Sequence, residues 1–182
     1  MKQQVDKILQ MAVLEEGDYE LNIVPVAVHE VIHKAVENIA LQVERKGGSI
    51  TCKLQAESSV INADPVHLTN IIHNVLDNAN KYSPEEPYIE VTTQNSDGVL
   101  KISIRDEGIG MKEEDARRAF EKYFRVSIGN RHDVKGFGLG LSYVKLMVEA
   151  HKGAVRFTSS LGKGTTVELT FTVANASRED NV

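Results

Sequence analysis

Apolar residues recur at a spacing of three and four positions in several stretches of the chain, which is the pattern of amphipathic helices. In the stretch that follows Asp64-Pro65, the aspartate is a good N-cap and the proline suits the first turn of a helix. Ser83-Pro84 closes the same stretch. The predicted helices cover residues 1–16, 27–45, 64–82, 112–121 and 139–151.

Shorter stretches, in which apolar and polar residues alternate, predict half-buried strands. Asp97-Gly98, between two of these stretches, is typical of a hairpin turn. Strands and helices follow one another without regular alternation, and this favours an α+β sandwich with helices on one face of a mixed sheet. The predicted strands lie at 50–54, 60–61, 89–91, 100–104, 155–157 and 167–173.

The composition narrows the class of protein. The 182 residues are 41% hydrophobic and 26% charged, and the net charge is −5, so a general nucleic-acid binder is not expected, although a nucleotide is not excluded. The single cysteine, Cys52, cannot form an internal disulfide or a zinc site that needs two cysteines. No apolar run reaches the roughly 20 residues that span a bilayer. We therefore expect a cytoplasmic domain without direct membrane insertion.

One motif has two interpretations. His29-Glu30-Val31-Ile32-His33 fits the H-E-x-x-H pattern of zinc peptidases, in which both histidines share a helix face and the glutamate is the general base. Val31 and Ile32 also belong to the apolar stripe, and no third zinc ligand stands at a recognisable spacing. An ordinary solvated helix face is therefore favoured over a zinc site.

A second motif lies on the predicted helix 64–82. At 100° per residue, Asn74, Asn78 and Lys81 fall within about 60° of one another. An asparagine carbonyl is a hard, neutral oxygen ligand for Mg²⁺, and a nearby ammonium suits phosphate oxygens. The alternative is a polar helix face, where asparagine is common.

Two glycine motifs complete the candidate chemistry. In Asp106-Glu107-Gly108-Ile109-Gly110, a carboxylate at a strand end precedes glycines that let a flat ligand approach the backbone. Residues 136–140, Gly-Phe-Gly-Leu-Gly, open the last helix, and N–H groups at a helix N-terminus bind anions. Between the two motifs, residues 126–138 have no apolar period and read as a functional loop, preceded by Phe120 and Phe124.

The order of these motifs resembles the catalytic ATP-binding domain of bacterial two-component sensor histidine kinases, members of the GHKL ATPase superfamily. The resemblance covers about residues 22–174 and implies the Bergerat, or GHKL, fold: a two-layer α/β sandwich with a mixed, mostly antiparallel sheet. It implies ATP and Mg²⁺ as ligands and transfer of the γ-phosphoryl group to a histidine. It also implies that residues 126–138 form the ATP lid.

The resemblance also implies roles for single residues. Asn78 and Asn74 are matched to the metal site, with Asn78 as the Mg²⁺ ligand, and together with Lys81 they are the expected catalytic residues. Lys81 and Tyr82 are matched to phosphate or ribose contacts, and Asp106 to the adenine amino group. The other residues that the resemblance places around the nucleotide are Gly108, Gly110, Lys122, Arg125, Lys135, Gly136, Gly138, Leu139, Gly140 and Thr165.

The phosphoacceptor histidine is expected elsewhere. In the family it lies on a dimerising two-helix hairpin before the ATP domain, whereas residues 1–16 contain no histidine. We therefore expect 1–21 to be the end of that hairpin's second helix plus a linker, 22–174 the catalytic domain and 175–182 a frayed tail. The hypothesis is that this chain binds MgATP but does not phosphorylate itself. The implied partners are the hairpin and a response regulator of the parent kinase, and the resemblance is compatible with an anchor of the parent in the inner membrane.

Two alternatives stay open at this point. One is a nucleotide-binding sensor without phosphoryl transfer, against which the intact Asn78 and Asp106 argue. The other is a superfamily ATPase that hydrolyses ATP. Some of these relatives place a glutamate as general base where Asn74 stands here, and an amide cannot take a proton.

Overall fold

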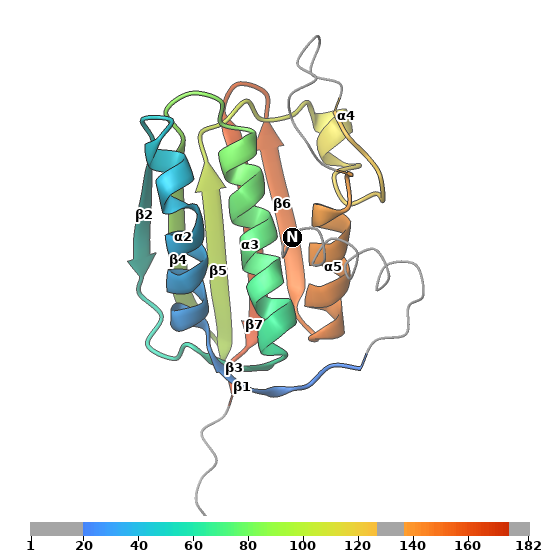
Figure 1. Cartoon of the computed structure of the whole chain (residues 1–182). Coiled ribbons are helices and arrows are strands. Elements are labelled where there is room, and N and C mark those ends of the chain that lie inside the picture. The colour runs from blue at the N-terminus through green and yellow to red at the C-terminus, as the bar shows by residue number, and fades with distance from the viewer. Residues whose placement is uncertain (1–19, 127–136, 175–182) are drawn as a thin grey trace, which may run out of the picture.

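The computed structural model of the chain describes residues 20–126 and 137–174. It has two layers, with one five-stranded sheet covered on one face by three helices (Figure 1). The predicted α+β sandwich, with a mixed and mostly antiparallel sheet, is confirmed. The helices are α2 (Val28–Glu44), α3 (Pro65–Lys81) and α5 (Gly140–Ala150), and a single turn forms α4 (Glu113–Ala116).

The sheet has the strand order β2-β4-β5-β7-β6. Only the pair β2 and β4 is parallel, and the other three pairs are antiparallel. The central strands β5 and β7 pair in a register that places Asp106 opposite Thr165 and Ile104 opposite Val167. The strands are β2 (Ser49–Leu54), β4 (Tyr88–Ser96), β5 (Val99–Asp106), β6 (Ala154–Ser160) and β7 (Gly164–Thr172).

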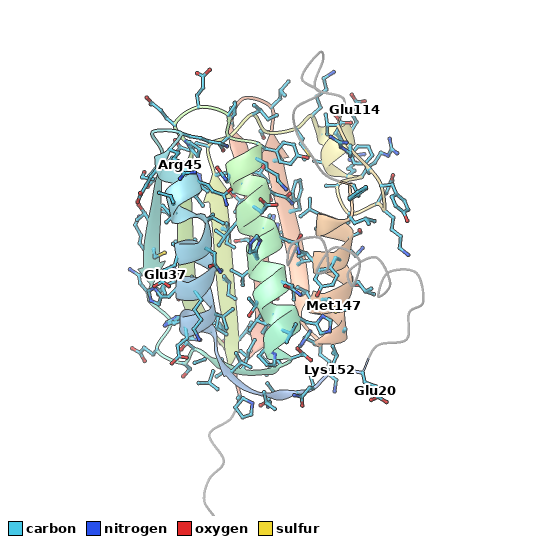
Figure 2. The ribbon with its side chains drawn as sticks, viewed as in Figure 1. Glu20, Glu37, Arg45, Glu114, Met147 and Lys152 are labelled. Carbon is cyan, nitrogen blue, oxygen red and sulfur yellow. The ribbon has the colours of Figure 1, made fainter. Side chains whose placement is uncertain are left out.

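A small second sheet closes one end of the molecule. β1 (Val24–Ala27) pairs with β3 (Val60–Ala63), and Ile61 forms a bridge to Val173 just after β7. The alternation of apolar and polar residues did not predict β1, and it predicted only residues 60–61 of β3. Figure 2 labels Glu20 and Lys152 toward this end, and Arg45 and Glu114 toward the opposite end of the sheet.

The core lies between the helices and one face of the sheet. On β4 and β5 the residues that face the helices are buried from Ile89 to Thr93 and from Leu100 to Asp106, whereas their neighbours on the other face are mostly polar and partly exposed. Each fully buried isoleucine or leucine stabilises the fold by about 1.5–3 kcal/mol relative to an exposed one. The largest buried side chains of this core include Ile32, Leu68, Ile72, Ile89, Ile102, Ile104 and Tyr143.

Asp64 fixes where α3 begins. Its Oδ1 accepts hydrogen bonds from the backbone N–H groups of Val66 (2.9 Å) and His67 (3.1 Å), and its Oδ2 accepts one from Asn22 (2.9 Å). Burial acts to raise the pKa of Asp64, but these N–H donors outweigh it and lower the pKa below its ordinary value. The backbone N–H of Asp64 donates to Nε2 of His151 (2.9 Å), which joins the start of α3 to the end of α5.

The other helix boundaries are close to those predicted, with one exception. The helix predicted over 112–121 is only the four residues of α4, because beyond Ala116 the backbone continues in tight turns such as Arg118 N–H to Asp115 O (3.0 Å). The helix predicted over 1–16 and the tail from 175 lie outside the described residues. Within the described part, no helix combines the length and the apolar character needed to cross a bilayer.

Candidate functional site

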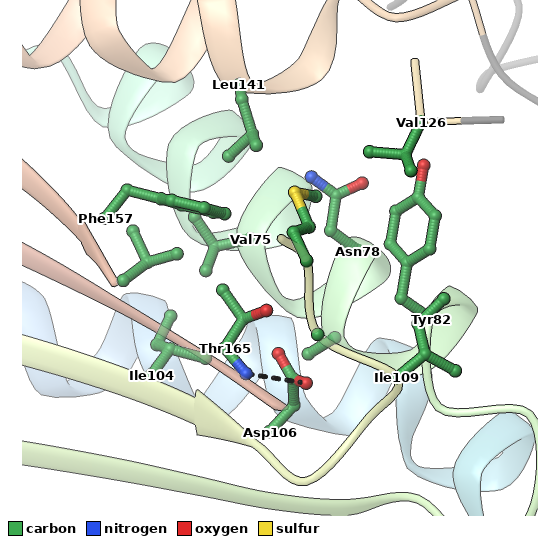
Figure 3. A pocket seen from close by; sticks show the side chains of 14 residues that line it. Val75, Asn78, Tyr82, Ile104, Asp106, Ile109, Val126, Leu141, Phe157 and Thr165 are labelled. Carbon is green, nitrogen blue, oxygen red and sulfur yellow. Dashed lines mark hydrogen bonds between the residues drawn. The ribbon is translucent and has the colours of Figure 1, made fainter. Parts of the chain in front are cut away.

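A cavity that is partly open to solvent lies between α3, the start of α5 and the sheet. Asp106 at the end of β5 and Thr165 at the start of β7 form its polar floor, and Asn78 enters it from α3 (Figure 3). Most of the remaining lining is apolar and comes from α3, α5, the strands β5, β6 and β7, the loop after β5 and the segment after α4. These residues are Val75, Ala79, Ile104, Ile109, Met111, Val126, Leu141, Phe157 and Val167.

Asp106 is the buried charge of the cavity, with only 7% of its surface exposed. Its Oδ1 accepts hydrogen bonds from the backbone N–H groups of Gly108 (2.9 Å) and Thr165 (3.2 Å). Its Oδ2 has no hydrogen-bond partner within the described residues. Burial raises the pKa of Asp106 from its ordinary 3.8 to about 6, so the carboxylate is still the main form at pH 7. The cavity therefore offers one free carboxylate oxygen as a hydrogen-bond acceptor between apolar walls.

The loop after Asp106 depends on a glycine. Gly110 has a φ of +60°, and a Cβ placed on it would lie 1.9 Å from the backbone oxygen of Ser160. Only glycine fits this approach, because both the backbone conformation and the missing side chain are required. Gly108 is also close-packed, since a Cβ there would lie 2.5 Å from the backbone oxygen of Tyr82. The two predicted glycines thus let the loop lie flat against the cavity.

The three polar residues predicted on one face of α3 have different surroundings. Asn78 lines the cavity. Asn74 donates from Nδ2 to the backbone oxygen of Asn70 (2.8 Å), and its Oδ1 faces Gly140, where a Cβ would lie 3.1 Å away. Lys81 forms an ion pair with Asp77 one turn earlier. The start of α5 therefore packs against Asn74, beside the cavity.

Tyr82, the last residue of the predicted motif, is half-buried and lines the cavity at the end of α3. Burial raises its pKa, and the positive charge of Arg125 acts in the opposite direction, which places Arg125 within electrostatic reach of the cavity. Arg125 and Lys122 are exposed on the segment after α4. The predicted Lys135 and Gly136 lie outside the described residues.

The start of α5 is held against the segment after α4. The backbone N–H of Tyr123 donates to the oxygen of Gly138 (3.0 Å), and Leu139 is the buried N-cap residue of α5. Phe120 contacts Phe157 edge to face, with ring centroids 5.8 Å apart, and the guanidinium of Arg118 lies 4.3 Å from the ring centre of Phe124. The two phenylalanines that the sequence singled out therefore lie in separate contacts.

Sequence reasoning missed Ser159. Its hydroxyl lies 2.9 Å from Thr165 Oγ1, 2.9 Å from the N–H of Met111 and 3.2 Å from the backbone oxygen of Gly164. A signal was available, because Ser159 has the same alternation parity as Val155 and Phe157, which face the helices. A polar side chain at such an inward position needs hydrogen-bond partners, and here it finds them beside the cavity.

The H-E-x-x-H motif is spread over a helix surface. Nε2 of His29 lies 2.9 Å from Oγ1 of Thr93, and His33 is exposed. Burial, and then the neighbouring His33, lower the pKa of His29. The described residues contain no group of three or more histidine, cysteine or acidic side chains arranged to hold a metal ion. The contact with Thr93 is that of a structural histidine on the side of α2.

The raised pKa of Asp106 predicts how stability depends on pH. Because the folded-state pKa of about 6 exceeds the unfolded value near 3.8, the stabilising effect of the proton is fully present below pH 4 and is lost as pH rises through 6. The unfolding free energy of the parent minus that of Asp106→Asn should fall by about 2–3 kcal/mol between pH 4 and pH 7. Urea unfolding of both proteins at several pH values measures this difference, and a constant difference would contradict the raised pKa.

Comparisons with known proteins agree with this geometry. Residues 63–175 match the family described as histidine kinase-, DNA gyrase B-, and HSP90-like ATPase. The sensor protein RprX of Bacteroides fragilis is 47% identical over 164 residues, which cover 89% of this chain and 32% of RprX. The sensor histidine kinase WalK of Bacillus subtilis is 28% identical over 97% of this chain and 29% of its own length. The chain thus spans about a third of the length of these curated relatives.

Solved structures give the same result. The mycobacterial sensor histidine kinase MprB has a TM-score of 0.70 and 28% identity, over 83% of this chain and 97% of that one. Full-length ShkA in complex with AMPPNP has a TM-score of 0.77 and 27% identity, over 93% of this chain and 35% of that one. The catalytic domain of the histidine kinase ThkA, at 18% identity and a TM-score of 0.73, covers 84% of this chain and 96% of its own, and shows the likeness of fold.

Proposed function

Since this chain belongs to the histidine kinase-, DNA gyrase B-, and HSP90-like ATPase family, we propose that it binds MgATP and donates the γ-phosphoryl group to a histidine. The proposal assigns it the catalytic part of a two-component sensor kinase. The observation that carries it is the buried Asp106, whose one free carboxylate oxygen lies beside the apolar walls of a cavity in this family's fold.

The cavity floor suits the adenine ring of ATP. An adenine presents an amino group with two N–H donors at one edge and two flat apolar faces. Oδ2 of Asp106 can accept one of these N–H groups, while the apolar lining, including Ile104, Met111 and Phe157, covers the faces. Oδ1 is held by two backbone N–H groups, so the carboxylate is fixed in orientation before the ligand arrives.

The metal and the phosphates are assigned to the side of the cavity next to α5. Asn78 lines the cavity without a side-chain hydrogen bond to another described residue, so its amide oxygen is available as a Mg²⁺ ligand. Oδ1 of Asn74 is also unbonded to described residues and is assigned to support the metal or its water. The ion would neutralise charge on the transferring phosphoryl group. Lys81 is assigned to a phosphate contact. For this its ammonium must either break its ion pair with Asp77 or contact Asp77 and a phosphate oxygen at the same time.

The remaining contacts are assigned to the segments on either side of the cavity mouth. Tyr82 and Arg125 lie within electrostatic reach of each other at one side of the cavity mouth, and both are assigned to contacts with the ribose or the phosphates. Gly138, Leu139 and Gly140 bring the N-terminus of α5 beside Asn74, where backbone N–H groups favour anions. Lys122 is assigned as a further phosphate contact, as are Lys135 and Gly136 outside the described residues.

The phosphoryl acceptor is proposed to come from another segment. A ring nitrogen of the acceptor histidine forms the new N–P bond as the bond from the γ-phosphorus to its bridging oxygen breaks and ADP leaves. No catalytic nucleophile is needed from this chain, whose part is positioning and charge neutralisation. We propose that residues 1–21 link it to a histidine-bearing hairpin, and that a response regulator then receives the phosphoryl group.

Substitution of Asn78 tests the proposed metal site. Titration calorimetry with a non-hydrolysable ATP analogue should show 1:1 binding that is tighter with Mg²⁺ than without it. In Asn78→Ala, we expect the Mg²⁺-dependent gain to fall by about tenfold or more, because an oxygen ligand is lost. The affinity measured without Mg²⁺ should stay within about twofold of the parent, since the base contacts are unchanged.

Asn38→Ala is the matched control, because Asn38 is an exposed asparagine on α2, away from the cavity. Equal losses with and without Mg²⁺ in Asn78→Ala would contradict the assignment of Asn78 to the metal. Absence of nucleotide binding by the parent chain would contradict the proposed function itself. Acid-labile phosphate on the chain alone, without an added histidine-bearing hairpin, would contradict the assignment of the acceptor to another segment.

A further inference from the structure

Ser159 joins three pieces of backbone under the cavity floor. It is on β6, and its hydroxyl contacts the N–H of Met111 in the loop after β5, the oxygen of Gly164 at the start of β7, and the hydroxyl of Thr165. Met111 and Thr165 both line the cavity, whereas Ser159 does not. Ser159 therefore touches the cavity through its neighbours.

Counting protons fixes the direction of each bond. A serine hydroxyl donates one hydrogen bond and accepts two. The N–H of Met111 can only donate to it, and the carbonyl of Gly164 can only accept from it. All three contacts are satisfied together only if Ser159 donates to Gly164 and Thr165 donates to Ser159. In this arrangement the proton of Thr165 is directed at Ser159, and Thr165 Oγ1 keeps its two lone pairs and can act only as an acceptor toward a ligand in the cavity.

We propose that Ser159 is a positioning residue that keeps the hydroxyl of Thr165 a hydrogen-bond acceptor, and that this makes the cavity select a base with an amino group. The inference rests on the proposed function. With Thr165 held in this way, the cavity floor presents two acceptors, Thr165 Oγ1 and Asp106 Oδ2. An amino group at position 6 of a purine carries two N–H donors and satisfies both acceptors. A 6-oxo group carries lone pairs instead, and it meets two acceptors without a donor.

The test is a comparison of two ligands, ADP and inosine diphosphate, which differ in the group at position 6 and in the proton that inosine carries on the adjacent N1. The parent chain should bind ADP more tightly. In Ser159→Ala, the hydroxyl of Thr165 is free to rotate and to donate to the 6-oxo group, so the preference for ADP over inosine diphosphate should fall by about five- to tenfold. Ser159→Thr keeps a hydroxyl on a strand residue and should restore most of the preference. Thr158→Val, which removes an exposed hydroxyl one position earlier, should leave the preference unchanged.

A second substitution separates positioning from simple support of the fold. In Thr165→Val, the hydroxyl that Ser159 acts on is gone, so adding Ser159→Ala should cause no further change in base preference. The proposal is overturned if Ser159→Ala weakens both ligands equally, or if its effect on the preference persists in the Thr165→Val background. If Ser159→Ala does not fold, an unchanged base preference in Thr165→Val alone would overturn it. Failure of the parent chain to bind ADP would instead count against the proposed function.

Discussion

Replacing Asp106 by asparagine is expected to weaken binding of adenine nucleotides by at least about 100-fold and to make the unliganded protein more stable. Asparagine keeps an oxygen that can accept from the N–H groups of Gly108 and Thr165. Its second group is an NH₂ in place of Oδ2, so a donor meets the donors of the adenine amino group, and a buried polar pair is left unmatched. Titration calorimetry with a non-hydrolysable ATP analogue measures the loss.

The gain in stability has a separate cause. At pH 7 the parent holds a charged carboxylate whose burial raises its pKa to about 6, and asparagine removes that charge. The unfolding free energy should rise by about 1–3 kcal/mol. Asp97→Asn is the control, because Asp97 is exposed in the hairpin at the other end of β5 and should change neither quantity. Undiminished binding by Asp106→Asn would contradict the placement of the base at Asp106.

Alanine at Gly164, the first residue of β7, is expected to destabilise the protein far more than alanine at Gly162, two residues earlier in the preceding turn. Both glycines have a positive φ, +86° and +75°, so both substitutions carry a similar backbone strain of about 1–2 kcal/mol. A Cβ on Gly164 would lie 2.0 Å from the backbone oxygen of Asp106, whereas one on Gly162 would meet nothing within 4 Å. The difference between the two variants therefore isolates the steric contact, which we expect to add at least about 2–3 kcal/mol.

Urea unfolding of both variants measures this difference. Gly164→Ala should also lose nucleotide affinity, because separating β7 from β5 pulls the N–H of Thr165 away from Asp106. Gly162→Ala should keep the affinity of the parent. Equal destabilisation by the two substitutions would show that the close approach of Gly164 to Asp106 does not exist in solution.

The helices and central strands could be predicted because their burial follows a local period. Asp64 and Pro65 place the start of α3, and the alternation of Leu100, Ile102 and Ile104 identifies β5. β1 could not be found in this way, since four residues that include Pro25 show no usable period. Its existence depends on pairing with β3, more than thirty residues later in the chain. When a short strand is stabilised by pairing with a distant segment, its own sequence does not need a periodic pattern of apolar residues.

The candidate site was predictable in part for the same reason. Asn78, Asp106 and Thr165 come from three distant segments and meet at one cavity, as the order of the motifs implied. The ion pair of Lys81 with Asp77 was not anticipated, although the two residues are one helical turn apart. Ser159 was missed because its partners, Met111 among them, come from other segments of the chain. Residue type and spacing identify what faces a ligand better than what supports it.

The small sheet of β1 and β3 has a mechanical consequence. Ile61 bridges Val173, and Ala174 donates its N–H to the oxygen of Val60. Since β3 also pairs with β1, the first strand and the last described residues are both attached at one end of the five-stranded sheet. Asp106 lies at the opposite end, eight residues along β5, or roughly 25 Å away. If the domain swings about that attachment as a rigid lever, a rotation of about 20° carries the cavity through an arc of roughly 9 Å, given the rise per residue of a strand. Small torsions at one end therefore become large displacements of the cavity at the other.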